Sequence, residues 1–145
     1  NTAGDYKATL KYFLDNRKWT NVSEFSPTLV KFFKEVISKY MHVGQIFVTR
    51  LDGGGVITEH NDIPEDSKQV HMFDMLNTFN LCLNHVQSCY SVFDNKVMPA
   101  YDGCLRWTNV GKKHWVVNMN RNPQYQIIWQ GIYKKDFRRL VMENK

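Results

Sequence analysis

Residues 44–60 read GQIFVTRLDGGGVITEH, and this stretch decides the fold class. Ile46 and Val48 recur at alternate positions, the period of two that is typical of a half-buried strand. The glycines within 52–55 predict a flexible turn, and 56–60 predicts a second strand directly after it. The stretch therefore predicts two β-strands joined by a tight, glycine-rich turn.

Further strands are predicted towards the C-terminus. Apolar residues alternate across 79–83, and Tyr90 and Phe93 lie in another short extended segment. Three more strands are predicted, at 103–109, 114–118 and 124–133. Several short strands with turn residues between them indicate an antiparallel sandwich or barrel, so we predict a mainly β fold.

Helices are predicted on both sides of this β core. Ser26 and Pro27 are typical of a helix start, and an apolar stripe with three- and four-residue spacing follows as far as Tyr40. The segments 5–14 and 136–143 are also predicted to be helical. Since no linker or repeat interrupts the chain, we expect a single domain over 1–145, with flanking helices at 1–43, a β core at 44–133 and a short C-terminal helix at 134–145.

The composition is that of an ordinary folded domain. The chain has 145 residues, of which 43% are hydrophobic and 23% charged, and these values exclude a disordered tail. No apolar run approaches the roughly 18 residues of a membrane-spanning helix, so we expect no membrane association. Cys82, Cys89 and Cys104 are an odd number of widely spaced cysteines, which predicts free thiols in a reducing, cytoplasmic setting.

The net charge of +5 suits an anionic ligand, either a small carboxylate or a nucleic acid. The one dense basic cluster has three- and four-residue spacing near the C-terminus: Lys134, Lys135, Arg138 and Arg139. A solvated helix face explains this cluster without any partner, because a basic run alone is a weak sign of nucleic-acid binding. Nucleic acid is therefore not the expected partner.

His60 and Asp62 are the first candidate site residues. Residues i and i+2 of a strand point to the same face, so an imidazole nitrogen and a carboxylate oxygen can meet one ion. A second imidazole from a distant strand, such as that of His114, completes a two-His-one-carboxylate set. The alternative is an exposed turn in which Asp62 caps the segment that begins at Ile63.

Two stretches resemble the aspartyl/asparaginyl β-hydroxylase family of iron(II)- and 2-oxoglutarate-dependent oxygenases. Residues 50–62, RLDGGGVITEHND, are similar to the family's first metal-binding element. Residues 103–118, GCLRWTNVGKKHWVVN, are similar to its glycine, apolar strand, Asn turn, distal His and following Asn. The resemblance covers roughly 44–133 and implies a double-stranded β-helix, which is a jelly-roll, cupin-like fold.

The same resemblance implies the roles of three side chains. His60, Asp62 and His114 would be the catalytic ligands of Fe(II), and 2-oxoglutarate would chelate the same ion as co-substrate. The positive net charge agrees with an anionic co-substrate.

The chain departs from the family at one position. The family's arginine for the far carboxylate of 2-oxoglutarate follows a proline, but here Gln124 follows Pro123. A neutral amide brings neither a charge nor a guanidinium fork. Arg106 on the neighbouring predicted strand is the preferred substitute, or else a solvent-facing residue, and Arg121 is a second candidate. Asn80 would hydrogen-bond the co-substrate, or else be satisfied by backbone.

Two functions from different classes follow from these observations. The first is an iron(II)- and 2-oxoglutarate-dependent dioxygenase, a hydroxylase that acts on a peptide side chain or a free amino acid. The second, which Gln124 favours, is a cupin-like metal- or ligand-binding module without 2-oxoglutarate turnover. A nucleic-acid-acting protein is a weaker third hypothesis. The remaining histidines, His42, His71 and His85, are expected to be structural or exposed.

Overall fold

The computed structural model describes residues 11, 15, 18–62 and 77–134. His71, most of the predicted helix over 5–14, the C-terminal helix and most of the basic cluster lie outside the described residues. The chain divides into two compact units, the first made of Asn1–Gln45 with Gln130–Lys145 and the second of Ile46–Trp129. Each unit is described by itself, and the single domain stays a prediction.

The first unit contains the predicted helix, in a shorter form. Helix α2 (Pro27–Glu35) begins with Ser26 at the N-cap position, although the Ser26 side chain makes no capping hydrogen bond. Phe33 from the apolar stripe is buried. The stripe was expected to continue the helix, but its last part forms the 3-10 turn η2 (Ile37–Lys39). A second 3-10 turn, η1 (Asn21–Phe25), precedes α2.

Strand β1 (Met41–Leu51) begins earlier than predicted, within the region expected to be flanking helix. His42, within the region expected to be flanking helix, therefore lies in this strand. Met41 is buried close to Gly131 of β8 (Gln124–Tyr133), where an added Cβ would lie 2.4 Å from Met41 Cε. A side chain at position 131 would separate the two strands, so glycine permits the close approach.

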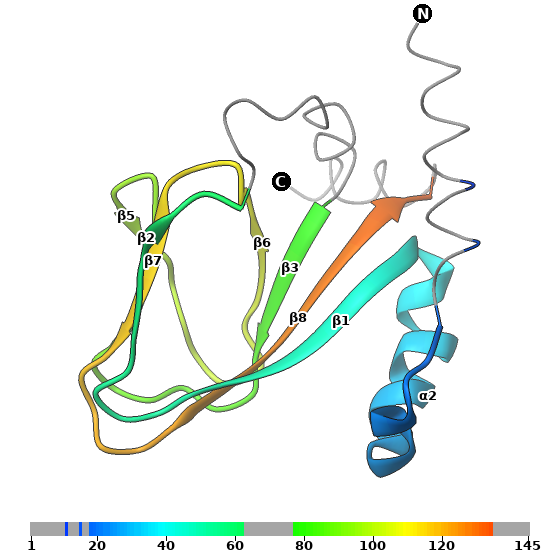
Figure 1. Cartoon of the computed structure of the whole chain (residues 1–145), viewed down its shortest axis with the longest axis horizontal. Coiled ribbons are helices and arrows are strands. Elements are labelled where there is room, and N and C mark those ends of the chain that lie inside the picture. Colours follow the sequence, from blue (N-terminus) through cyan, green and yellow to red (C-terminus); the bar gives the residue numbers. More distant parts are fainter. Residues whose placement is uncertain (1–10, 12–14, 16–17, 63–76, 135–145) are drawn as a thin grey trace, which may run out of the picture. The chain divides into compact units, whose positions relative to one another are not determined.

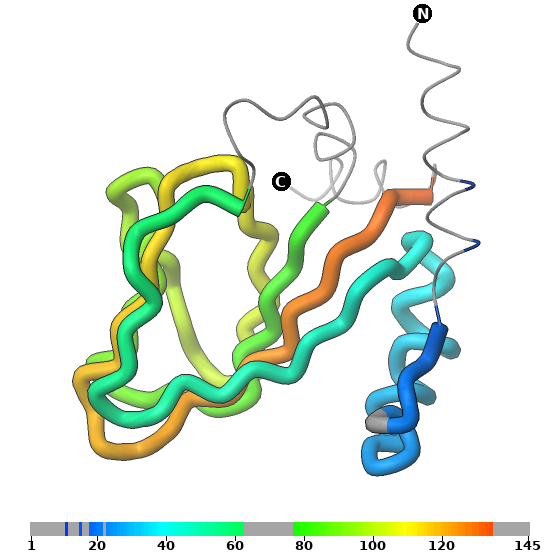
Figure 2. The backbone as a smooth tube through the Cα atoms, viewed as in Figure 1, coloured from blue at the N-terminus to red at the C-terminus, as the bar shows by residue number. Residues whose placement is uncertain are grey.

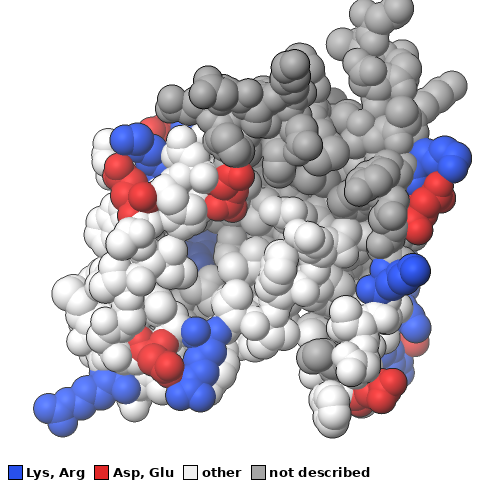
Figure 3. Space-filling model, in the orientation of Figure 1, with Lys and Arg blue, Asp and Glu red and all other residues white. Residues whose placement is uncertain are grey.

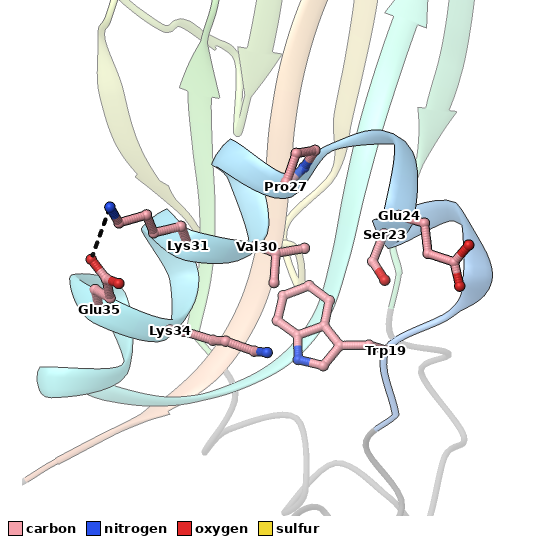
Figure 4. Close-up of a pocket in the computed structure, with 8 residues that line it drawn as sticks. All are labelled: Trp19, Ser23, Glu24, Pro27, Val30, Lys31, Lys34 and Glu35. Atoms are coloured by element: carbon pink, nitrogen blue, oxygen red, sulfur yellow. Dashed lines mark ion pairs between the residues drawn. The ribbon is translucent and has the colours of Figure 1, made fainter.

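The first unit also has a surface hollow beside α2 (Figure 4). Trp19 lies over it, with Lys34 Nζ 5.7 Å from the ring centroid. Lys31 and Glu35 form an ion pair at 4.0 Å along the helix. None of the predicted site residues lines this hollow.

Both sheets of the predicted barrel are present, and β1 and β8 are the two strands that extend from the second unit into the first. The two four-stranded sheets have the orders β1-β8-β3-β6 and β2-β7-β4-β5 (Figure 1). The strands not yet introduced are β2 (Val56–His60), β3 (Asn77–Cys82), β4 (Cys89–Phe93), β5 (Lys96–Val97), β6 (Leu105–Thr108) and β7 (His114–Asn118). Strands distant in sequence are neighbours in each sheet, which is the double-stranded β-helix, or jelly roll. The mainly β, cupin-like fold class is confirmed.

The turn between β1 and β2 requires its glycines. Gly54 has a φ of +77°, in the left-handed region that favours glycine. A Cβ at Gly53 would lie 2.5 Å from the carbonyl oxygen of Arg121, so no side chain fits there. Gly54 N donates to Asn118 O at 2.8 Å, and Asn118 N donates to Gly55 O at 2.9 Å. The turn thereby fixes the start of β2 to the end of β7.

The sheet that contains β3 and β6 gathers polar side chains on one face. Asn80 lies opposite Arg106 in the register of β3 and β6, and Arg106 Nη2 donates to Gln126 Oε1 at 3.3 Å. Phe79 and Trp129 stack at 5.4 Å on the opposite face, because successive side chains of a strand alternate. We call six buried side chains the polar face: Thr78, Asn80, Arg106, Thr108, Gln124 and Gln126.

The three cysteines are free, as predicted, and all three are buried. Burial raises the pKa of the Cys82 and Cys89 thiols. As for membrane insertion, the helices within the described ranges are all too short or too polar to span a bilayer.

Candidate metal centre

The fold brings His60, Asp62 and His114 together. His60 ends β2 and His114 begins β7, and the antiparallel register places the two residues opposite each other. Figure 2 shows β2 and β7 running side by side through this part of the chain. The two rings have centroids 4.3 Å apart. One ligand atom from each of the three residues lies within 4.8 Å of the others.

Both imidazoles direct the same nitrogen towards Asp62. His60 Nε2 lies 3.3 Å and His114 Nε2 lies 3.5 Å from Asp62 Oδ1. On the other side of each ring, His60 Nδ1 is 2.6 Å from the carbonyl of Thr58, and His114 Nδ1 is 2.8 Å from that of Lys112. A protonated Nδ1 donates to each carbonyl, which leaves both Nε2 lone pairs free for a metal.

The donor set therefore fits a divalent ion. When both Nδ1 atoms carry the proton, two Nε2 lone pairs and a carboxylate oxygen converge without a hydrogen between them. Without an ion, these three electron-rich atoms repel one another. A cation placed among them is coordinated by all three. Two imidazoles and one carboxylate suit iron(II), and nickel and zinc bind the same ligand types. Three protein ligands leave further coordination positions for small molecules.

The three candidate ligands differ in how deeply their side chains are buried. His114 is 8% exposed, and its ring lies parallel to that of Phe93 at a centroid distance of 4.8 Å. The side chains of His60 and Asp62 are 40% and 37% exposed. The backbone of Asp62 is fixed by a hydrogen bond from its N–H to Val110 O at 3.1 Å. One side of the site is thus buried and the other is open to solvent.

The structure places the other predicted site residues in two different environments. Arg106 is 5% exposed on the polar face, so the solvent-facing alternative is wrong. Asn80 donates to Thr108 Oγ1 at 2.9 Å, and Gln124 is almost fully buried. Arg121, in contrast, is exposed on the turn between β7 and β8, apart from the polar face.

Other residues of these two regions were not identified from the sequence. Gln126, Thr78 and Thr108 complete the polar face, and the two-residue spacing from Gln124, Asn80 and Arg106 is the only signal that could have found them. Phe93 had no such signal, because its position beside His114 depends on the pairing of β4 with β7.

No family model and no curated protein sequence matches the chain. Solved structures with a similar fold include a predicted oxalate decarboxylase from Thermotoga maritima, at 13% identity and a TM-score of 0.47, covering 68% of this chain and 73% of that one. A Cupin 2 conserved barrel domain protein from Salinispora arenicola has 15% identity and a TM-score of 0.41, covering 68% and 70%. KdgF from Halomonas sp. has 10% identity and a TM-score of 0.41, covering 66% and 80%.

These similarities are too low to assign a family or an activity. All three TM-scores lie below 0.5, so the jelly roll is established by the strand order itself. The resemblance to aspartyl/asparaginyl β-hydroxylases stays a prediction.

Proposed function

We propose that this chain is a cupin-like metal-binding protein that holds one divalent ion with His60, Asp62 and His114. A single observation carries the proposal: ligand atoms of all three residues lie within 4.8 Å of one another. The hydrogen bonds from both Nδ1 atoms support it, because they orient the metal-binding nitrogens before any ion arrives.

Titration calorimetry with nickel(II), as a redox-stable probe, tests this proposal. We expect about one ion per chain in the unaltered protein and a large loss of affinity in His60→Ala and Asp62→Ala. His85→Ala is the matched control, because His85 is exposed and makes a backbone contact, from its N–H to Asp102. Full loading of both site variants, with unchanged circular dichroism, would contradict the metal centre.

A finer proposal is that the ion is iron(II) and that the protein is a 2-oxoglutarate-dependent hydroxylase. The chemistry that this pair supplies, when bound, is oxygen-dependent hydroxylation of a C–H bond. In this proposal His60 and His114 orient the ion, and Arg106 and Asn80 bind the co-substrate's carboxylate. The expected prime substrate is a peptide side chain or a free amino acid on the open side of the centre.

Anaerobic addition of iron(II) and then 2-oxoglutarate separates the two levels of the proposal. A weak visible charge-transfer band on adding 2-oxoglutarate supports the hydroxylase. Iron binding without that band supports a metal-binding module without 2-oxoglutarate turnover and removes the hydroxylase. The Asp62→Ala variant is the control, because it should show neither iron binding nor the band.

A further inference from the structure

The outward face of the β2-β7-β4-β5 sheet is apolar. In the register of β4 and β7, Phe93 lies opposite His114 and Val92 lies opposite Trp115. Because successive side chains of a strand alternate, Val92 and Trp115 lie on the face opposite to that of His114. The face of His114 is the inward one, since it also carries three buried residues: Cys89, Ser91 and Asn118. The same alternation assigns six residues to the outward side, which we call the apolar face: Val56, Tyr90, Val92, Val97, Trp115 and Val117.

Much of the apolar face is open to solvent. Val56 is 60% exposed and Val97 is 62% exposed. These two residues lie on β2 and β5, the two edge strands, so the exposed apolar surface spans the whole width of the sheet. The solvated face of an antiparallel sheet ordinarily carries polar residues. A contiguous apolar patch in such a place is typical of an interaction surface.

The apolar face is also uncharged. Two charged residues adjoin it, Glu59 on β2 and Lys113 directly before β7, and they form an ion pair with each other at 3.3 Å. Figure 3 shows an uncharged surface over β2 and β7, on the left of the view, between two groups of charged side chains. The chain has a net charge of +5, so two copies repel each other where their charged surfaces meet. Across the apolar face, two copies can approach without that repulsion.

We infer that the apolar face binds the same face of a second copy of this chain. In a twofold dimer the same patch contributes from both subunits, so apolar side chains cover apolar side chains. Two sheets that stack face to face lie about 10 Å apart, as they do in a β-sandwich. This contact goes beyond metal binding and needs no ion, because His114 lies on the opposite face of the sheet.

The size of the apolar face predicts a weak dimer. Four strands about 4.8 Å apart, with about 3.4 Å per residue along the five residues of β7, give a face of roughly 15 Å by 17 Å. This area is well below the roughly 800 Å² that each partner buries in a standard interface. We therefore expect a dissociation constant between about 1 μM and 1 mM.

Sedimentation velocity with chelator-treated protein tests the inference. The unaltered protein should shift from monomer to dimer as its concentration rises from about 1 μM to about 1 mM. Tyr90→Lys and Val97→Lys should each weaken dimerisation about 10-fold or more, because the twofold axis brings two like charges into an apolar contact. Leu105→Lys is the matched control, since Leu105 is also exposed, at 52%, but lies on β6 of the other sheet. Its dimerisation should equal that of the unaltered protein.

Three results would overturn the inference. The first is an unaltered protein that stays monomeric up to about 1 mM. The second is a dimer that Tyr90→Lys and Val97→Lys leave unchanged, because its contact lies on another surface. The third is a monomer that binds phosphatidylcholine vesicles and loses this binding in Val97→Lys, because the face then docks on lipid. If circular dichroism shows that Tyr90→Lys does not fold, Val97→Lys decides.

A nickel(II) titration keeps this result apart from the metal centre. Val97→Lys should bind nickel(II) as the unaltered protein does, because Val97 lies on the outward side of the sheet. His60→Ala should dimerise as the unaltered protein does, because His60 lies opposite His114 on the inward side. Dimerisation that requires nickel(II), or that His60→Ala abolishes, would place the contact at the metal centre and contradict the inference.

Discussion

The two histidines of the candidate centre differ in how much the fold depends on them. His60 is 40% exposed, whereas His114 is 8% exposed and stacks on Phe93. Loss of a metal ligand and loss of packing are therefore separable at this site. A variant at position 60 removes a ligand, and a variant at position 114 removes a ligand together with part of the interior.

His114→Ala should therefore destabilise the metal-free protein more than His60→Ala does. We expect a loss of about 1–3 kcal/mol in the free energy of unfolding for His114→Ala and about 0.5 kcal/mol or less for His60→Ala. Urea unfolding in the presence of a chelator measures both. Equal losses would mean that the Phe93 contact contributes nothing to stability.

The buried thiols make stability fall at alkaline pH. The folded-state pKa values of Cys82 and Cys89 lie above the ordinary value of 9.0, so the folded protein favours the neutral thiol. The contribution of the two thiols to the free energy of unfolding is fully present below about pH 9, and it is lost as the pH rises from there through the folded-state pKa. Urea unfolding between about pH 8 and pH 10 should show this decline.

The double variant Cys82→Ala, Cys89→Ala provides the control for that decline. It removes both titrating groups, so its free energy of unfolding should depend less on pH over the same range, whatever its absolute value. An identical slope in the two proteins would assign the decline to other groups.

At the scale of elements, the glycine turn between β1 and β2 does more than reverse the chain. It is held against the turn that follows β7 by the hydrogen bonds of Asn118, and Gly53 lies in backbone contact with Arg121. The strand that ends in His60 starts from this turn. Its position relative to His114 consequently depends on how closely the two turns approach.

Gly53→Ala should lower the free energy of unfolding more than Gly54→Ala does. A Cβ at position 53 meets backbone at 2.5 Å, whereas at position 54 it meets no atom within 4 Å and only the positive φ is unfavourable. We expect a destabilisation of about 1 kcal/mol for Gly54→Ala and about 2 kcal/mol or more for Gly53→Ala. Gly53→Ala should also weaken nickel(II) binding, measured by calorimetry. The reverse ranking would contradict the packing of the two turns.

How far the sequence predicts these elements depends on whether the signal is local. The strand around Ile46 and the glycine turn depend on neighbouring residues, and both are found, although Val48, expected on a half-buried face, is 58% exposed. The earlier start of β1 at Met41 and the shorter α2 are set by tertiary contacts, such as that of Met41 with Gly131. Local apolar spacing carries no information about such contacts.

In the candidate site, too, local sequence signals predict some residues and tertiary contacts set the others. The pair His60 and Asp62 follows from strand geometry alone, because residues two apart share a face. His114 is a candidate second imidazole on a distant predicted strand, and the resemblance assigns it as a ligand, since the register of β2 and β7 is not readable from either strand. Alternation also groups Asn80 with Thr78, but it does not say which face of a strand is inside. The polar face was for that reason predicted only in part.

At the scale of the molecule, metal binding should stabilise the fold. An ion held by His60, Asp62 and His114 binds the folded chain and not the unfolded one. Nickel(II) at 100 times its dissociation constant should add about 2.7 kcal/mol to the free energy of unfolding and raise the Tm. His60→Ala should show no such rise in a thermal scan. An equal rise in that variant would place the bound ion elsewhere.

The two faces of the β1-β8-β3-β6 sheet also have a consequence for how such a protein can diversify. The stacked rings of Phe79 and Trp129 lie on one face, and the residues that would select a ligand lie on the other. Substitutions at Asn80 or Gln126 leave the stacked pair untouched, so descendants of one ancestral barrel can acquire new ligand preferences while they retain the same scaffold.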